Sequence, residues 1–335
     1  MTNKTPDASN FSLYLIFSEG LQFTTSQIQT ALLEDFPDLD IDVTQNMDFP
    51  AACDTDQAIP MAPILMGARG ADAIMVNMMR LPGYGIWDPK AVQPRQLLAC
   101  ADYDLKGALT RNRSYLCVSV DAKSNTLEDR FRAARLASCV GALFAELPIC
   151  LGAYWEPADH FLSPQGVREM AQTAMEDGWP VRSWVGVSLA SLQAADPRGR
   201  PWSTGSTLGL RYFTGYEMQL VAAPYDLDRS CSTLWGMAWL PLVSGNQFAE
   251  GHTIGDEGGA EEDKLRLRWL PKGATSKRVK SDPLPFDTFI AIHPESPFDE
   301  AAYFGKRWGR SRRKQVITQA PRPNFFKRMM GRGHA

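Results

Sequence analysis

The chain alternates short apolar runs with amphipathic stretches, the pattern of strands that are followed by helices. Residues 11–17 are apolar and aromatic and predict a buried strand. Thr24 and Gln27 have the spacing of a capping box, and apolar residues then recur every four positions as far as Pro37, which predicts a helix. Further expected elements are strands at 39–44, 61–66 and 71–79 and a helix at about 94–109.

The middle of the chain has the clearest pattern. Residues 114–120 predict a strand, and Asn125 with Glu128 forms a second capping-box pattern that opens a helix through Leu147. Ser163 followed by Pro164 predicts the start of another helix. The remaining expected elements are strands at 149–155, 181–189, 207–213 and 216–222, a helix at about 228–240 ended by Pro241, and an edge strand at 264–269.

This order of strands, helices and hairpins predicts an α+β fold, with helices against one face of mostly antiparallel sheets. The length fits two α/β sandwich units of ferredoxin-like type. We expect an N-terminal unit at 11–109 and a C-terminal unit at 111–272. Proline, charge and lost periodicity predict a Pro-rich linker and basic tail at 273–335.

Composition is that of an ordinary globular protein, with 44% hydrophobic and 22% charged residues in 335. The net charge of −3 hides an asymmetry: residues 301–335 contain ten Lys or Arg and no Asp or Glu. The other 300 residues therefore hold 25 basic and 38 acidic side chains, a balance of −13. Because an acidic body repels polyanions, contact with nucleic acid or anionic lipid would have to use the tail.

The six cysteines have no CxxC pair and mostly lie in apolar runs, so we expect buried thiols of a reducing compartment. The first ten residues lack the pattern of a secretory signal, and every apolar stretch is too short to span a membrane. A cytoplasmic location is expected.

Several short motifs occur in a fixed order between about residues 111 and 272: 114–120, 151–155, 180–186, 203–210, 216–220 and 250–255. Together they resemble an uncharacterised bacterial family, the domain of unknown function numbered 4261. The resemblance implies no assigned activity and no catalytic residues. Where many relatives have a His-x-x-His-like element, this chain has Asn112, Arg113 and Tyr115. By analogy, families of this sort often accompany secretion or toxin-immunity systems.

Three polar residues are candidates for chemistry. His160 follows Glu156 and Asp159 and would suit a cation or a general base, or else a solvated loop. His252 lies between Gly251 and Gly255, where glycines allow either close approach of a ligand or a simple turn with positive φ. Glu217, on an expected strand, is either a buried acid opposite His252 or an outward polar residue. The chain contains no GxSxG, HExxH, Walker or zinc-ribbon motif, so no cofactor or metal is expected.

The basic tail interleaves cationic and apolar residues, as partner-docking and membrane-surface segments do, although a disordered solubilising tail has the same composition. Its candidate binding residues are Lys306, Arg307, Arg310, Arg312, Arg313, Lys314, Lys327 and Arg328. The leading hypothesis is a non-enzymatic binding or accessory protein with a protein partner, in which the tail meets an acidic partner or an anionic surface. The alternative is a hydrolase or metal-dependent enzyme that uses Glu217 and His252, with His160 as a third candidate.

Overall fold

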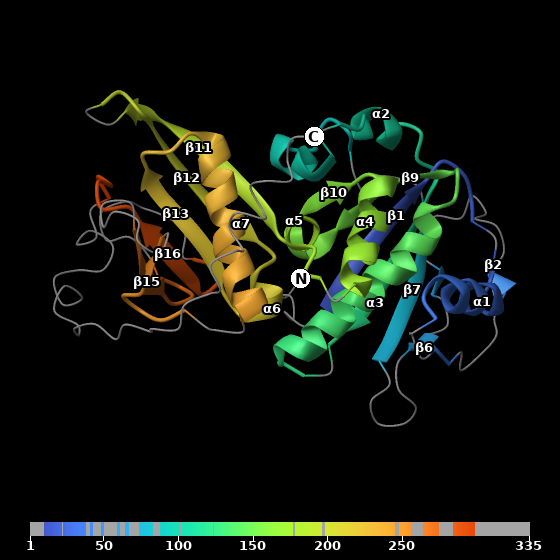
Figure 1. The fold of residues 1–335 in the computed structure, drawn as a ribbon. Coiled ribbons are helices and arrows are strands. Elements are labelled where there is room, and N and C mark those ends of the chain that lie inside the picture. The colour runs from blue at the N-terminus through green and yellow to red at the C-terminus, as the bar shows by residue number, and fades with distance from the viewer. Residues whose placement is uncertain are drawn as a thin grey trace.

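The computed structural model describes residues 10–21, 23–37, 41–42, 48–49, 59–60, 64–66, 74–82, 88–100, 102–122, 124–176, 178–195, 198–244, 248–255, 264–274 and 284–298. These residues form two large sheets, each backed by helices, that lie side by side, and one small sheet of two strands (Figure 1). None of the helices in these ranges is long and apolar enough to cross a membrane.

Within the described ranges, the larger sheet has eight strands, and its central strand joins segments that are far apart in the sequence. β1 pairs antiparallel with β8 on one side and with β9 on the other, and the main path of the sheet runs β10-β9-β1-β8-β7-β6-β3. Two further short strands, β2 (Phe23–Thr24) and β4 (Asp48–Phe49), pair with each other. The eight strands are β1 (Asn10–Phe17), β3 (Ile41–Asp42), β5 (Ile59–Pro60), β6 (Ile64–Met66), β7 (Ile74–Pro82), β8 (Ser114–Asp121), β9 (Cys150–Trp155) and β10 (His160–Leu162).

Helices cover both faces of this sheet. α1 (Thr25–Asp35), α3 (Leu127–Ala145) and α4 (Pro164–Met175) pack against one face, where alternate β1 residues such as Leu13 and Leu15 enter the main core (Figure 1). The 3-10 helix η1 (Pro94–Cys100) and α2 (Leu105–Leu109) pack on the opposite face with Ile16 and Tyr115. Successive side chains of β1 point to opposite faces of the sheet, so this one strand contributes to the hydrophobic packing on both faces.

The second sheet has six strands in the order β11-β12-β13-β16-β15-β14 among the described residues. All of its pairs are antiparallel except β13 with β16. The helix α7 (Leu227–Ser244) lies along one face of β11, β12 and β13 (Figure 1). The strands are β11 (Gly186–Ala195), β12 (Pro201–Leu208), β13 (Glu217–Ala223), β14 (Thr253–Ile254), β15 (Leu265–Leu270) and β16 (Thr288–Ile292).

A cluster of aromatic rings joins the two sheets into one hydrophobic core. Trp184, from the short helix α5 (Val181–Trp184), stacks on Phe213, from α6 (Arg211–Thr214), with 5.4 Å between ring centroids. Phe213 in turn lies 5.2 Å from Phe11 of β1, and Phe11 stacks on Trp155 of β9 at 6.1 Å. The indole N–H groups are also used, because Trp155 donates to the Trp184 carbonyl and Trp184 donates to Ser138 of α3. Rings of both sheets therefore share one dry interior.

The expected α+β class with mostly antiparallel sheets is confirmed. The capping box of Thr24 and Gln27 begins α1, and Ser163 caps α4 with Pro164 in its first turn. At α3 the cap is Thr126 rather than Asn125, since the Thr126 hydroxyl accepts from the Asp129 N–H. Of the described thiols, Cys117, Cys139 and Cys150 are buried and Cys231 is half-buried, all four free.

Several expected elements were wrong in type or extent. Residues 181–184 form α5 instead of the start of a strand. The carbonyl of Pro180 accepts hydrogen bonds from the N–H groups of Ser183 and Trp184, which closes a helical turn. The expected strand at 207–213 is the end of β12 followed by α6. Pro241 lies inside α7 and does not end it. The expected helix at 94–109 is two short pieces, η1 and α2.

The expected division at residue 110 is wrong for the sheets, because β8 lies beyond it yet pairs with β1 and β7. The prediction of a linker from residue 273 is wrong for residues 288–292. These residues form β16, which is buried between β13 and β15. For the same reason β15 is an interior strand, not the expected edge. The Gly251–Gly255 loop does lie at a sheet edge, which β14 forms. The tail expected to extend or disorder beyond about Ala301 lies outside the described residues.

We predict that Gly209→Ala lowers the free energy of unfolding by about 3 kcal/mol or more, measured by urea denaturation. Gly209 has φ +93°, and a Cβ there would lie 2.6 Å from the Pro157 carbonyl oxygen, across the contact between the two sheets. Gly215→Ala is the matched control, because its φ of +86° is similar but nothing lies within 4 Å of the added carbon. Gly215→Ala should lower the free energy of unfolding only by the backbone strain of a positive φ, about 1 to 2 kcal/mol. Equal losses in both variants would contradict the close contact.

Candidate functional site

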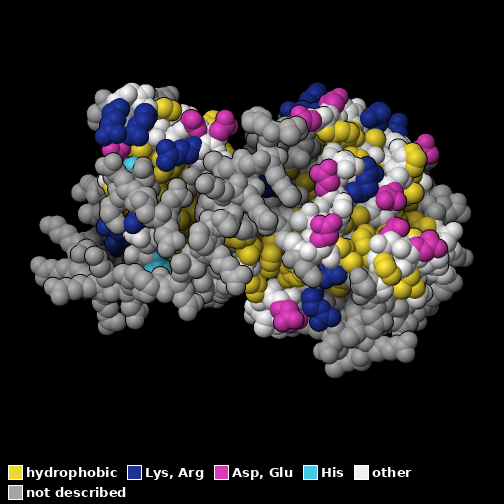
Figure 2. All heavy atoms as spheres, viewed as in Figure 1, with side chains coloured by type: hydrophobic (Ala, Val, Ile, Leu, Met, Phe, Trp, Pro, Cys, Tyr) yellow, Lys and Arg dark blue, Asp and Glu magenta, His cyan; other side chains and the backbone are white. Residues whose placement is uncertain are grey.

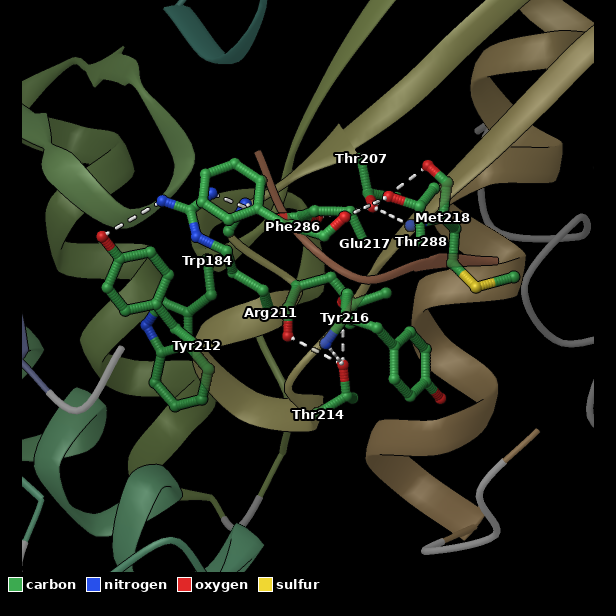
Figure 3. Close-up of polar contacts among 12 residues, drawn as sticks. Trp184, Thr207, Arg211, Tyr212, Thr214, Tyr216, Glu217, Met218, Phe286 and Thr288 are labelled. Atoms are coloured by element: carbon green, nitrogen blue, oxygen red, sulfur yellow. Dashed lines mark hydrogen bonds and ion pairs between the residues drawn. The ribbon is translucent and has the colours of Figure 1, made fainter. Parts of the chain in front are cut away.

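The carboxylate of Glu217, at the start of β13, is buried. Thr207 of β12 donates its hydroxyl proton to Oε2 at 2.7 Å, and the Gly209 N–H donates to Oε1 at 2.8 Å. Arg211 completes the set, with Nη1 3.2 Å from Oε1 (Figure 3). Thr207 is itself held by the N–H of Met218, which donates to its hydroxyl at 2.8 Å.

Arg211 is the partner that the carboxylate needs in this dry place. Its guanidinium lies 3.7 Å from the ring centroid of Phe286 and 4.7 Å from that of Tyr212, so both faces are covered by aromatic rings (Figure 3). Burial raises the pKa of Glu217, while Arg211, Thr207 and the Gly209 N–H act in the opposite direction. Every polar contact of this group is with another part of the fold, which is the arrangement of a structural ion pair.

His252 does not face Glu217, contrary to the expected pairing. It lies before β14, three strands from β13, or about 14 Å at the usual strand spacing. The two are also at opposite ends of β16, because Glu217 pairs with Thr288 while Ile292 pairs with Arg266 beside β14.

The loop around His252 forms a tight turn. The imidazole Nδ1 accepts from the Ala249 N–H at 3.1 Å, and the His252 carbonyl accepts from Leu267 N–H at 2.7 Å. Gly251 has φ +83° with open space around it, whereas Gly255 packs tightly against Lys264. The turn interpretation accounts for both glycines.

His160 lies in the other sheet, at the contact between β10 and α5. It is buried, and its Nε2 is 2.8 Å from the Ser183 carbonyl oxygen, so this nitrogen carries the proton and donates it. Burial lowers the pKa of His160 to about 4, against smaller opposite effects of Ser183 and Asp159. His160 is therefore neutral at pH 7 and ties the two halves together.

The acidic neighbours of His160 point elsewhere. Asp159, with φ 48°, forms an ion pair with Arg95 at 2.6 Å and accepts from Gln96 and Tyr154 at 2.7 Å each. These contacts bind η1 to the end of β9. Among the described residues, no three His, Cys, Asp or Glu side chains come close enough to hold a metal ion.

The structure thus separates the three candidates. Two surface depressions of about 460 and 430 Å³ also occur, one beside Tyr103 and Leu105 and the other beside Gln27 and Thr30. None of the three candidates lines either depression. The candidate binding residues Lys306, Arg307, Arg310, Arg312, Arg313, Lys314, Lys327 and Arg328 lie outside the described residues.

Arg211, which pairs with Glu217, and Phe286, which stacks on Arg211, were not predicted from the sequence. A signal for Arg211 was present, because a charged residue between apolar neighbours in a stretch interpreted as a strand requires a partner of opposite charge if it is buried. Phe286 gave none, since it lies in a stretch expected to be a linker.

Comparison of the chain with family models, curated proteins and solved structures finds no match. The resemblance to the domain of unknown function numbered 4261 stays a prediction.

We predict that Arg211→Met destabilises the protein by about 3 to 5 kcal/mol, because it leaves the Glu217 carboxylate buried without its cation. Adding Glu217→Gln to the same chain should recover part of that loss. Urea denaturation of the four members of this mutant cycle gives the values. Arg200→Met is the control, since the Arg200–Glu295 pair at 2.5 Å is about one-third exposed and is worth about 0 to 1 kcal/mol. A cycle with no coupling would refute the ion pair.

A second prediction concerns pH. The folded-state pKa of His160, about 4, lies below its unfolded value of 6.5, so the unfolded chain binds the extra proton between these values. The stability that this group contributes is fully present above pH 6.5 and is lost as the pH falls toward 4, by about 3 kcal/mol. His160→Gln keeps a donor for Ser183 and removes the titration. Its stability curve should be flatter than the wild-type curve in this window, and parallel curves would contradict the prediction.

Proposed function

We propose that this protein is a non-enzymatic binding or accessory protein of the cytoplasm, with a protein partner that carries negative charge. The supporting observation is the placement of Glu217, whose carboxylate is saturated by Thr207, Gly209 and Arg211 and is three strands away from His252. A general acid or base must reach a reacting group, and a carboxylate held in this way serves the fold first.

The charge distribution favours an acidic partner. The tail concentrates ten basic residues in 301–335, while the rest of the chain carries −13. Contacts between these two parts would be exposed pairs worth about 0 to 1 kcal/mol each and weakened by salt, so a more acidic partner would displace them. As part of the same proposal, membership of the family numbered 4261 would place the protein among bacterial accessory proteins.

The test compares the full chain with a variant in which six tail residues are replaced by Gln: Lys306, Arg307, Arg310, Arg312, Arg313 and Lys314. Immobilised wild-type protein should retain a stoichiometric partner from an extract of the native host at low salt. The variant should retain about tenfold less, because it lacks the steering and contact charges. Elemental analysis and screens for esterase and phosphatase activity accompany the binding assay.

A matched control makes the same change of charge on the body, by replacing six exposed residues with Gln: Lys90, Lys106, Arg111, Arg113, Arg198 and Arg229. It should retain the partner as wild type does. Equal retention by all three proteins would remove the tail from the proposal. A stoichiometric metal ion, or turnover that is lost in Glu217→Gln or His252→Asn, would replace the proposal with the enzyme alternative.

A further inference from the structure

A strip of three aromatic rings and one arginine lies at the surface where the two halves of the molecule meet. It runs from Phe131 of α3 through Trp179 to Arg182 of α5 and Trp235 of α7, and we call these four residues the seam strip. Phe131 and Trp179 lie 4.6 Å apart, and the Arg182 guanidinium carbon lies 5.0 Å from the Trp235 ring centroid. Figure 2 shows hydrophobic side chains at the surface where the two halves adjoin.

The rings of the strip are held from beneath. Trp179 and Phe131 both contact the fully buried Trp184, at 5.8 and 5.5 Å, and Trp235 donates its indole N–H to the Val185 carbonyl at 3.2 Å. All three strip rings are nevertheless partly exposed. Rigid, half-exposed Trp and Phe rings on a fixed base are typical of binding hot spots, because ordering them on binding costs little entropy.

Arg182 supplies the charge of the strip. Its side chain is exposed, stacks on Trp235 and, within the described part of the chain, makes no ion pair. A stacked guanidinium keeps its N–H edge directed at solvent, where a carboxylate can accept two hydrogen bonds.

We propose that the seam strip docks an acidic segment of the partner protein, with apolar side chains on the rings and a carboxylate at Arg182. This inference rests on the proposed function and assigns its surface. The chain's own basic tail has the wrong charge for this surface, and a second copy would bring two positive strips together. A short acidic peptide carries far less negative charge than a nucleic acid, so a body with charge −13 repels it less.

The experiment selects peptides from a displayed random library on the immobilised full-length protein. Selected peptides should be rich in Asp or Glu next to aromatic or aliphatic residues. Their affinity should fall about tenfold or more on Arg182→Glu, as expected for a hot spot whose charge is reversed. Arg111→Glu makes the same change at an exposed site away from the strip and should leave affinity unchanged.

The other outcomes overturn the inference. It fails if no peptide is enriched, if the selected peptides are basic, or if both variants bind alike. It also fails if vesicles of equimolar phosphatidylserine and phosphatidylcholine, or a single-stranded oligonucleotide, bind through Arg182 while the peptides do not. Peptide binding that is lost only when the tail is neutralised would reject the strip and keep the binding function, whereas no peptide binding together with measurable turnover would reject both.

Discussion

The contact between Trp184 and Phe213 is the interaction on which the rest of the structure depends. Phe213 comes from α6, which joins two strands of the smaller sheet, and it reaches Phe11 on the central strand of the larger sheet. Trp184 is buried beneath the same contact and binds Ser138 of α3 and the indole of Trp155. Since each large ring buries about 150 to 250 Å², this cluster fixes how the two sheets meet. Two further contacts join the same two halves: His160 bonds to the Ser183 carbonyl, and Gly209 packs against the Pro157 carbonyl.

The ion pair of Glu217 and Arg211 lies directly beside that contact. Burial of two charges is expensive, and the stacking of Arg211 between Tyr212 and Phe286 removes it further from water. Such a pair adds little net stability compared with apolar residues of the same size, but each partner alone is strongly unfavourable. The pair instead determines position, because it holds α6, and with it Phe213, at the start of β13. A residue chosen as a catalytic candidate thus has its clearest role in the docking of the two halves.

The starts of helices could be predicted from the sequence, but the pairing of strands that are far apart in the chain could not. Thr24 with Gln27 and Ser163 with Pro164 mark helix starts because their hydrogen bonds reach only three residues along the chain. The pairing of β1 with β8 and β9 depends on residues about 100 positions away or more, about which a single strand pattern says nothing. Residues 181–184 misled because they lead directly into the strand β11, and four residues are too few for periodicity to distinguish a strand from a helical turn. The separation of Glu217 from His252 likewise depends on β16, whose short apolar run was hidden among prolines and charges.

The position of β16 has a consequence for how the chain folds. β13 and β15 are not neighbours; each pairs with β16, which lies between them and comes after both in the sequence. The smaller sheet therefore stays open until residue 292 is available, even though β11, β12 and β13 can assemble earlier as a meander. During synthesis on a ribosome, the edge of β13 therefore stays unpaired until β16 has been made. An unpaired strand edge can form hydrogen bonds with other extended chains. The described strands of the larger sheet all end by residue 162, so synthesis delivers the strands of the two sheets in sequence and makes β16 the closing strand.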